Sequence, residues 1–256
     1  MTAAKITLIG GPTALIEFAG FRCLTDPTFD PPGEYKLPHV TLRKTSLPAL
    51  ASNEIGRVDA VLLSHDQHAD NFDHAGRAYA MQAPRLFTTR SGATRLGGIA
   101  EGMTPGESRE LAKADGSKLT ITATPARHGP AGIKPLAGDV IGFILSAPPA
   151  RPIYITGDTV WYDGVAETAQ RFHPGLVLLF AGAAKTRGAF HLTMSANDAI
   201  DTAQACPDAL IVPVHYEGWA HFSQSGEDLV QSFKALGIGA RLRLLEPGIA
   251  TTIDLP

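Results

Sequence analysis

Short aliphatic runs, many of them followed by a loop that carries His or Asp, dominate the hydrophobic pattern of the chain. The run 59–63 is the clearest, because it ends abruptly in Ser64-His65-Asp66-Gln67-His68-Ala69-Asp70-Asn71. Apolar runs of this length with polar flanks are typical of buried strands. The same pattern predicts strands at 5–9, 15–18, 21–25, 85–88, 107–111, 118–126, 140–145, 152–156, 175–180, 209–214, 241–245 and 249–253.

Helices are expected between several of these strands. The predicted segments are 73–81, 90–96, 160–171, 195–206 and 228–236. Ser195 is expected to cap its helix, with Asp198 three residues later in an approximate capping box. The segment 28–53 has little periodicity and carries four prolines, which predicts a long loop, and its His39 is expected at the surface or lining a pocket. No linker or repeat interrupts the chain, so we expect a single domain over 1–256.

Composition narrows the class of protein. The 256 residues are 44% hydrophobic and 18% charged, as in soluble globular proteins. A net charge of −3 without any Lys/Arg-rich run argues against a nucleic-acid partner. Cys23 and Cys206 lie far apart and form no CxxC pair, which fits a reducing cytoplasm. No signal-peptide or membrane-spanning apolar stretch is present, so we expect a cytoplasmic protein that does not insert into membranes.

Potential metal ligands follow four of the predicted strands. They are His65, Asp66, His68 and Asp70 after the first, His128 after the second, Asp158 after the third and His215 after the fourth. Each residue alone is equally compatible with a turn or a solvated loop. However, sheets of α/β proteins place ligand sites at strand ends, and imidazole nitrogens and carboxylate oxygens bind divalent metal ions. The shared context therefore predicts a metal site.

These segments resemble the metallo-β-lactamase superfamily, over nearly the whole chain and in the family's order. The matching pieces are Leu24-Thr25-Asp26-Pro27, the 64–71 segment, His128, Thr156-Gly157-Asp158-Thr159 and Val212-Pro213-Val214-His215-Tyr216. Asp26-Pro27 and His191-Leu192-Thr193-Met194 look most like the branch of ascorbate-6-phosphate lactonases and N-acyl-phosphatidylethanolamine phospholipases. The resemblance implies an α/β fold, the four-layer αββα sandwich, with a metal site at one edge of its two sheets.

The resemblance also implies a ligand set for one or two divalent ions, Zn²⁺ or Mn²⁺. The first ion would be held by His65, His68 and His128, and the second by Asp70 and His215, with Asp158 as the bridge. The usual His-x-His-x-Asp-His motif is irregular here, so either Gln67 is an insertion and His65 ligates, or Asp66 takes its place. We favour His65, since it comes first after the strand. Asn71 replaces the last histidine, which predicts a weakened second site or one that prefers a harder ion such as Mn²⁺.

The implied activity is hydrolysis of a small ester, lactone or phosphodiester by a metal-bound hydroxide. Asp70 would orient the hydroxide and accept its proton, His191 would polarise or protonate the substrate, and Asp26 would orient ligands. Substrate contact, or equally core packing, is expected for Trp161, Tyr162, Tyr216, Trp219 and His221. The alternative is a metal-poor, non-catalytic binding relative with the same fold, which Asn71 motivates. No Gly-x-Ser-x-Gly motif supports a serine hydrolase, and homo-oligomers are compatible with the resemblance.

Overall fold

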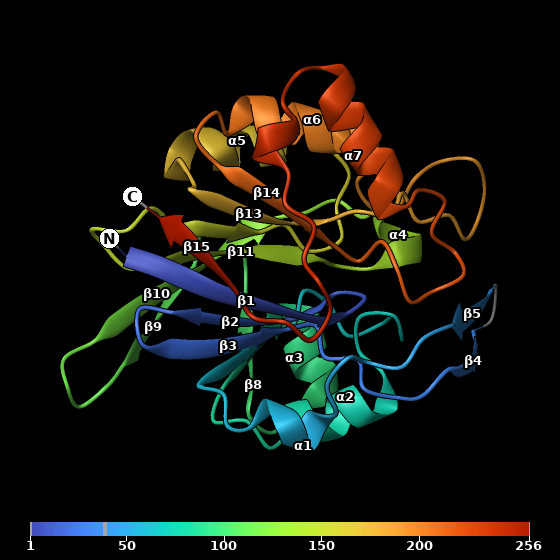
Figure 1. Cartoon of the computed structure of the whole chain (residues 1–256). Helices are drawn as coiled ribbons and strands as arrows, with labels where there is room; N and C mark the ends of the chain where they lie inside the picture. Colours follow the sequence, from blue (N-terminus) through green and yellow to red (C-terminus); the bar gives the residue numbers. More distant parts are fainter. Residues whose placement is uncertain (1, 38–39, 256) are drawn as a thin grey trace.

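Two large sheets form the centre of the molecule in the computed structural model, which describes residues 2–37 and 40–255. The first sheet has the strand order β15 (Thr251–Leu255), β1 (Thr2–Gly10), β2 (Thr13–Phe18), β3 (Phe21–Thr25), β6 (Ala60–Leu62), β7 (Leu86–Thr89) and β8 (Ala100–Met103). The second has the order β14 (Leu210–Val214), β13 (Leu176–Phe180), β12 (Ile153–Ile155), β11 (Ile141–Ser146), β10 (Lys118–Pro125) and β9 (Ser108–Ala112). The sheets lie face to face (Figure 1).

Helices cover the outer face of each sheet (Figure 1). On the first sheet lie α1 (Ser52–Ile55), α2 (His74–Ala80) and α3 (Arg90–Leu96), and on the second lie α5 (Asp163–Phe172), α6 (Ala196–Ala205) and α7 (Gly226–Ala235). A short helix, α4 (Lys134–Ala137), follows β10, and a 3₁₀ turn covers Gly239–Arg241. The predicted αββα sandwich is confirmed. No helix in residues 2–37 and 40–255 combines the length and apolar character needed to cross a bilayer.

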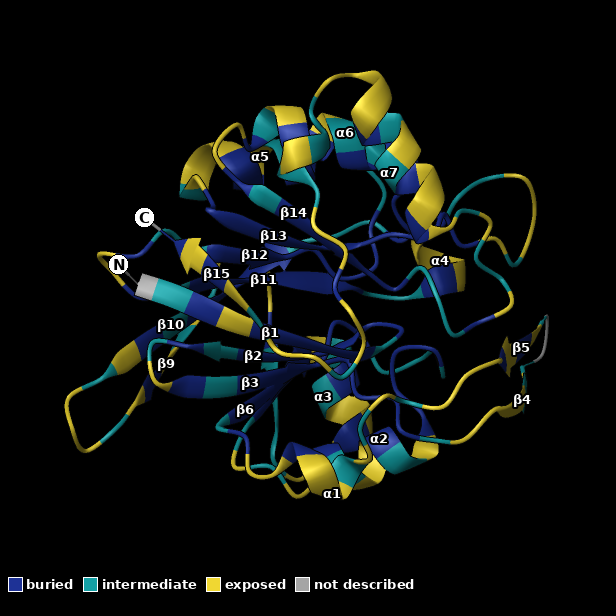
Figure 2. Cartoon of the chain, viewed as in Figure 1, coloured by how far each residue is buried: buried dark blue, intermediate teal, exposed yellow. Residues whose placement is uncertain are grey.

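Three apolar clusters match the three interfaces between the four layers. The largest lies between the sheets and includes Ile6, Phe18 and Phe143, all at most 2% exposed. A second, around Tyr154 and Phe233, lies beneath α5–α7, and a third lies beneath α1–α3. The central strands of both sheets are therefore buried, while the exposed residues gather on the outward faces of the helices, on loops and on the edge strands β9 and β15 (Figure 2). Because apolar burial fixes both sheets, the strand ends form a stable edge for the site.

The region 28–53 is more ordered than a long loop. It contains a hairpin of β4 (Gly33–Lys36) and β5 (Thr41–Lys44), which pairs Tyr35 with Leu42. His39 lies outside the described residues. The predicted strand at 241–245 is wrong, because the Arg241 guanidinium donates hydrogen bonds to backbone carbonyls at and beyond the C-terminal end of α6. These bonds hold the segment over the helix layer, and Leu242 makes only an isolated bridge to the edge strand β14.

The Ser195 cap is confirmed. Ser195 Oγ accepts a hydrogen bond from the Asp198 backbone N–H at 3.3 Å, and Asp198 Oδ2 accepts one from the Ser195 N–H at 2.9 Å. This reciprocal pair satisfies two N–H groups that the first turn of α6 would otherwise leave unpaired. The capped helix starts directly after the segment 191–194, so the cap also fixes the path of the chain beside the strand ends.

Candidate metal centre

Parallel strand pairs bring the predicted ligands to one edge. β3 pairs in parallel with β6, which places Asp26 beside Ser64, and β12, β13 and β14 run parallel, which carries Asp158 and His215 to the same end. The turn before Asp158 needs glycine, because Gly157 has φ +61° and a Cβ there would lie 2.5 Å from a backbone carbonyl oxygen. The topology therefore joins residues that are up to 150 positions apart in the chain.

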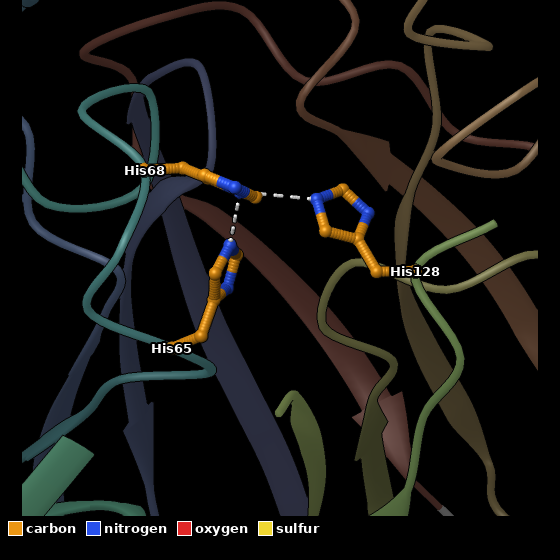
Figure 3. A group of neighbouring side chains, drawn as sticks. All are labelled: His65, His68 and His128. Carbon is orange, nitrogen blue, oxygen red and sulfur yellow. Dashed lines mark hydrogen bonds between the residues drawn. The ribbon is translucent and has the colours of Figure 1, made fainter. Parts of the chain in front are cut away.

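Three imidazoles converge at this edge. His65 Nε2 and His128 Nε2 lie 2.8 and 3.1 Å from His68 Nδ1 (Figure 3). His65 and His128 are buried, and His68 is partly buried. Nitrogen atoms at this spacing are suited to one shared metal ion, since zinc–nitrogen distances are about 2.0–2.1 Å.

In His65 and His128, the Nδ1 nitrogen makes a hydrogen bond, which leaves the lone pair of Nε2 free. The Ser64 hydroxyl donates to Asp26 Oδ1 at 2.6 Å, so its oxygen accepts from His65 Nδ1–H at 2.9 Å. His128 Nδ1–H donates to the backbone carbonyl of Leu192 at 2.8 Å. Such outer contacts select the tautomer that binds metal and orient the ring. Asp26 thus acts on His65 through Ser64, a residue that sequence reasoning missed although it lies between the strand and His65.

A second group consists of two carboxylates and one imidazole. The ligand atoms of Asp70, Asp158 and His215 lie within 4.8 Å of one another, and all three residues are buried. His215 Nδ1 lies 3.0 Å from Asp158 Oδ1, and His215 Nε2 lies 3.5 Å from Asp70 Oδ2. The other Asp158 oxygen, Oδ2, lies 3.4 Å from His128 Nε2. Asp158 therefore spans the two groups, as a bridging ligand would.

The electrostatics of the two groups differ. Burial and the neighbouring imidazoles hold the pKa of His65 well below its ordinary value and lower that of His68 to about 4, so both rings are neutral, the form that binds metal. In the second group burial opposes charge, but Asp158 raises the pKa of His215 to about 10. The imidazoles of His221 and His215 hold the pKa of Asp70 well below its ordinary value against the effect of burial. The second group therefore favours a positive charge between its two carboxylates.

Buried polar atoms that lack a hydrogen-bond partner indicate whether a metal ion fits the site. Among the described residues, both ring nitrogens of His215, Asp158 Oδ2 and Asn71 Oδ1 are buried without a hydrogen-bond partner of acceptable geometry. Buried polar atoms in native proteins are almost always paired, and leaving one unpaired costs about 1–3 kcal/mol. Ligand-type atoms that face one another unpaired are what a bound cation requires. The residues of both groups fit a divalent metal ion.

The residues of the irregular motif at 64–71 take different positions relative to the two ligand groups. His65 joins the imidazole group, whereas the Asp66 carboxylate points to α3 and accepts two hydrogen bonds from Arg95, at 2.6 and 2.9 Å. Asn71 lies beside the second group, where its Nδ2 donates to Asp158 Oδ1 at 3.3 Å. The structure thus places His65 among the candidate ligands and Asp66 outside them, while the ligand set itself stays a prediction.

A pocket opens directly over both groups. His68, Asp70, His128 and His221 form its polar side. Its apolar wall comes from the β4–β5 hairpin, the α4 region and the 184–192 segment: Leu37, Val40, Leu42, Ile133, Leu136, Ala137, Ala184 and Leu192. Thr186 and Arg187 complete the lining. The hairpin in the region 28–53 therefore contributes a wall of the pocket.

Most of the predicted pocket residues lie elsewhere. Trp161, Tyr162 and Tyr216 pack against the cluster beneath α5–α7, and the Tyr162 ring stacks on the guanidinium of Arg127 at 4.5 Å. Trp219 is buried against Tyr35 of the hairpin. His221 lines the pocket, whereas at 191–192 the lining residue is Leu192. The catalytic role of His191 stays a prediction; the residue is half-buried and directly precedes the pocket-lining Leu192 in the chain.

Comparison with known proteins agrees with this geometry. Residues 22–216 match the family described as "Beta-lactamase superfamily domain". This span is most of the chain, so the chain belongs to this superfamily and has the metallo-β-lactamase fold.

The chain is also similar to individual proteins over nearly its whole length. The chain is 26% identical to the "UPF0173 protein YddR" of Bacillus subtilis, covering 97% of this chain and 99% of that protein. It is 25% identical to a "UPF0173 metal-dependent hydrolase" of Caldivirga maquilingensis, over 94% and 93%. Among solved structures, an isothiocyanate hydrolase from Delia radicum gut bacteria superimposes with a TM-score of 0.84 at 26% identity, covering 98% and 99% of the two chains.

Proposed function

We propose that the protein is a metal-dependent hydrolase of a small, uncharged substrate with an apolar part. The observation that carries the proposal is the pocket, which places an apolar wall directly above the two ligand groups. Relatives named metal-dependent hydrolases over nearly the full length support the same reaction class. His65, His68 and His128 would hold one ion, and Asp70 and His215 the other, with Asp158 between them. The all-imidazole group suits Zn²⁺, and the carboxylate-rich group also accommodates Mn²⁺.

Bound divalent ions would supply two effects: they lower the pKa of a coordinated water to about 7 and polarise the oxygen of a carbonyl or phosphoryl group. The protein groups do the rest. Asp70 would orient the attacking water and take its proton, and Asp158 would keep the two ligand groups together. Ser64 and Leu192 hold the rings of His65 and His128 in the required tautomers. The apolar wall excludes bulk water and positions the substrate.

The lining of the pocket favours some substrates over others. The segments around Asp26 and His191 resemble a branch that acts on both lactones and phosphodiesters, so the resemblance alone leaves both open. In the described part of the wall, Arg187 is the one cationic side chain among eight apolar residues. A phosphodiester anion would require more positive charge there. An ester, a lactone or a similar neutral electrophile fits better, and the relative named isothiocyanate hydrolase supports this class.

A panel of four probes tests the proposal: a hexanoyl ester, a lactone with an alkyl tail, an aryl isothiocyanate and a diaryl phosphodiester. With Zn²⁺ or Mn²⁺ added, we expect at least one neutral probe to be hydrolysed more than about tenfold faster, as kcat/KM, than the phosphodiester. A chelator should remove the activity. Preference for the phosphodiester, or activity that survives metal removal, would contradict the proposal.

A matched pair of leucines tests the role of the apolar wall. Leu136 lines the pocket and Leu236 follows α7, and both are 56% exposed, so neither should be essential for folding. Leu136→Asp should raise KM for the neutral probes about tenfold, because a bound apolar substrate would cover and partly desolvate the new carboxylate, and a cost of about 1.4 kcal/mol is tenfold in affinity. Leu236→Asp should leave KM unchanged. Equal KM values in the two variants would remove this wall from the substrate site.

A further inference from the structure

His221 stands at the border between the pocket and the second ligand group. Its Nε2 lies 2.9 Å from Asp70 Oδ2, and the carboxylate can only accept, so His221 donates this hydrogen bond. Both side chains are less than 10% exposed. His221 is not one of the three residues whose ligand atoms lie within 4.8 Å of one another. It therefore contacts a candidate ligand from outside the group.

The backbone around His221 is fixed from two sides. Its carbonyl accepts a hydrogen bond from the Lys185 N–H at 3.0 Å, in the segment that forms one pocket wall. The preceding Ala220 N–H donates to the Arg43 carbonyl of β5 at 3.0 Å, in the hairpin that forms the opposite wall. The imidazole also contacts the ring of Phe222, with centroids 4.7 Å apart. A histidine whose backbone is held in this way can keep its imidazole beside the Asp70 carboxylate.

The second group requires such support. Asp70 Oδ2 is 3.5 Å from His215 Nε2, and Asn71 next to it offers an amide, which is a poor zinc ligand. An aspartate with two equivalent oxygens can rotate away from a metal ion unless another donor fixes it. Hydrogen bonds from surrounding groups to ligands typically change metal affinity about 10- to 100-fold.

We propose that His221 is a positioning residue for the second metal ion: by donating from Nε2 to Asp70 Oδ2, it fixes the Asp70 carboxylate and so sets the affinity of the carboxylate-rich group. This inference rests on the proposed function, because it presumes that both groups bind metal. It concerns only the second ion, and the imidazole group keeps its affinity without His221.

The test measures bound Zn²⁺ per chain across a series of chelator-buffered free Zn²⁺ concentrations. The metal-stripped wild type should bind in two steps. His221→Ala should weaken one step about 10- to 100-fold and leave the other unchanged. His221→Gln places an amide N–H donor near the same point and should recover affinity to within about threefold of wild type. His173→Asn removes a histidine at the left-handed C-cap of α5 and serves as the matched control with unchanged binding.

The outcomes separate the two proposals. If wild type binds no Zn²⁺, the proposed function fails and the role of His221 fails with it. If wild type binds in two steps and His221→Ala does the same with unchanged affinities, only the role of His221 is overturned. A His221→Gln variant that binds as weakly as His221→Ala would also overturn it, because the replacement N–H donor would then fail to restore the affinity. Circular dichroism of each metal-free variant verifies that it is folded.

Discussion

Asp158→Asn should lower hydrolysis by about a thousandfold and remove at least one metal ion per chain. Asp158 lies between the two groups, with one oxygen 3.0 Å from His215 Nδ1 and the other 3.4 Å from His128 Nε2. Asparagine has almost the same shape but lacks the negative charge that balances a cation and attracts two ions. Loss of Lewis-acid stabilisation worth several kcal/mol corresponds to a rate loss of this size, since about 1.36 kcal/mol is tenfold.

Asp66→Asn is the matched control for this prediction. It changes a carboxylate of the ligand segment that bonds Arg95 on α3 and points away from both groups. Metal content should stay at the wild-type level, and the rate should stay within about threefold of wild type. If Asp66→Asn lost metal as Asp158→Asn does, the alternative alignment of the irregular motif, with Asp66 as ligand, would be supported. An Asp158→Asn variant with full metal and full rate would refute the bridging role.

Asp73→Ala should destabilise the folded protein by about 3–5 kcal/mol, the usual cost of leaving a buried charge without its partner. Asp73 caps α2, and its two oxygens accept four hydrogen bonds: from Lys44 Nζ and the backbone N–H groups of Phe29, Asp30 and Gly76, all at 2.7–2.9 Å. The side chains of Lys44 and Asp73 are 4% and 0% exposed. Without the carboxylate, a buried ammonium and three N–H groups lose their partner at once.

Urea denaturation of the metal-free protein measures this effect as a shift of the midpoint at constant m-value. Asp228→Ala removes a carboxylate that completes the capping box of α7 but lies at the surface, so its midpoint should change far less. Because Asp73 ties α2, the segment after β3 and the hairpin together, Asp73→Ala should also loosen the pocket wall. A midpoint within the error of wild type would show that this buried pair does not stabilise the fold.

The sequence predicted most strands and the ligand-bearing strand ends because both follow from local patterns, whereas the four layers came from the family resemblance. Short apolar runs identify buried strands, and a His or Asp just past such a run lies at the edge of the sheet whatever the details of pairing. This is how His128, Asp158 and His215 were named although each occurs singly. The helix cap at Ser195 is equally local, and it was predicted to the residue.

Features set by long-range contacts could not be predicted in the same way. The segment 241–245 has the composition of a strand, but the bonds of Arg241 to the carbonyls of Ala203 and Ala209 draw it over a helix. The β4–β5 hairpin was missed because prolines obscure its alternation. The link from Asp26 through Ser64 to His65 joins residues almost 40 positions apart, so only the folded structure displays it.

The metal content of the purified wild-type protein tests the central claim most directly. Elemental analysis after purification in buffer supplemented with Zn²⁺ or Mn²⁺ should give about two divalent ions per chain, one for each ligand group. Fewer than about a tenth of an ion per chain would contradict a metal-dependent hydrolase and would favour a binding protein that keeps the fold without the metal.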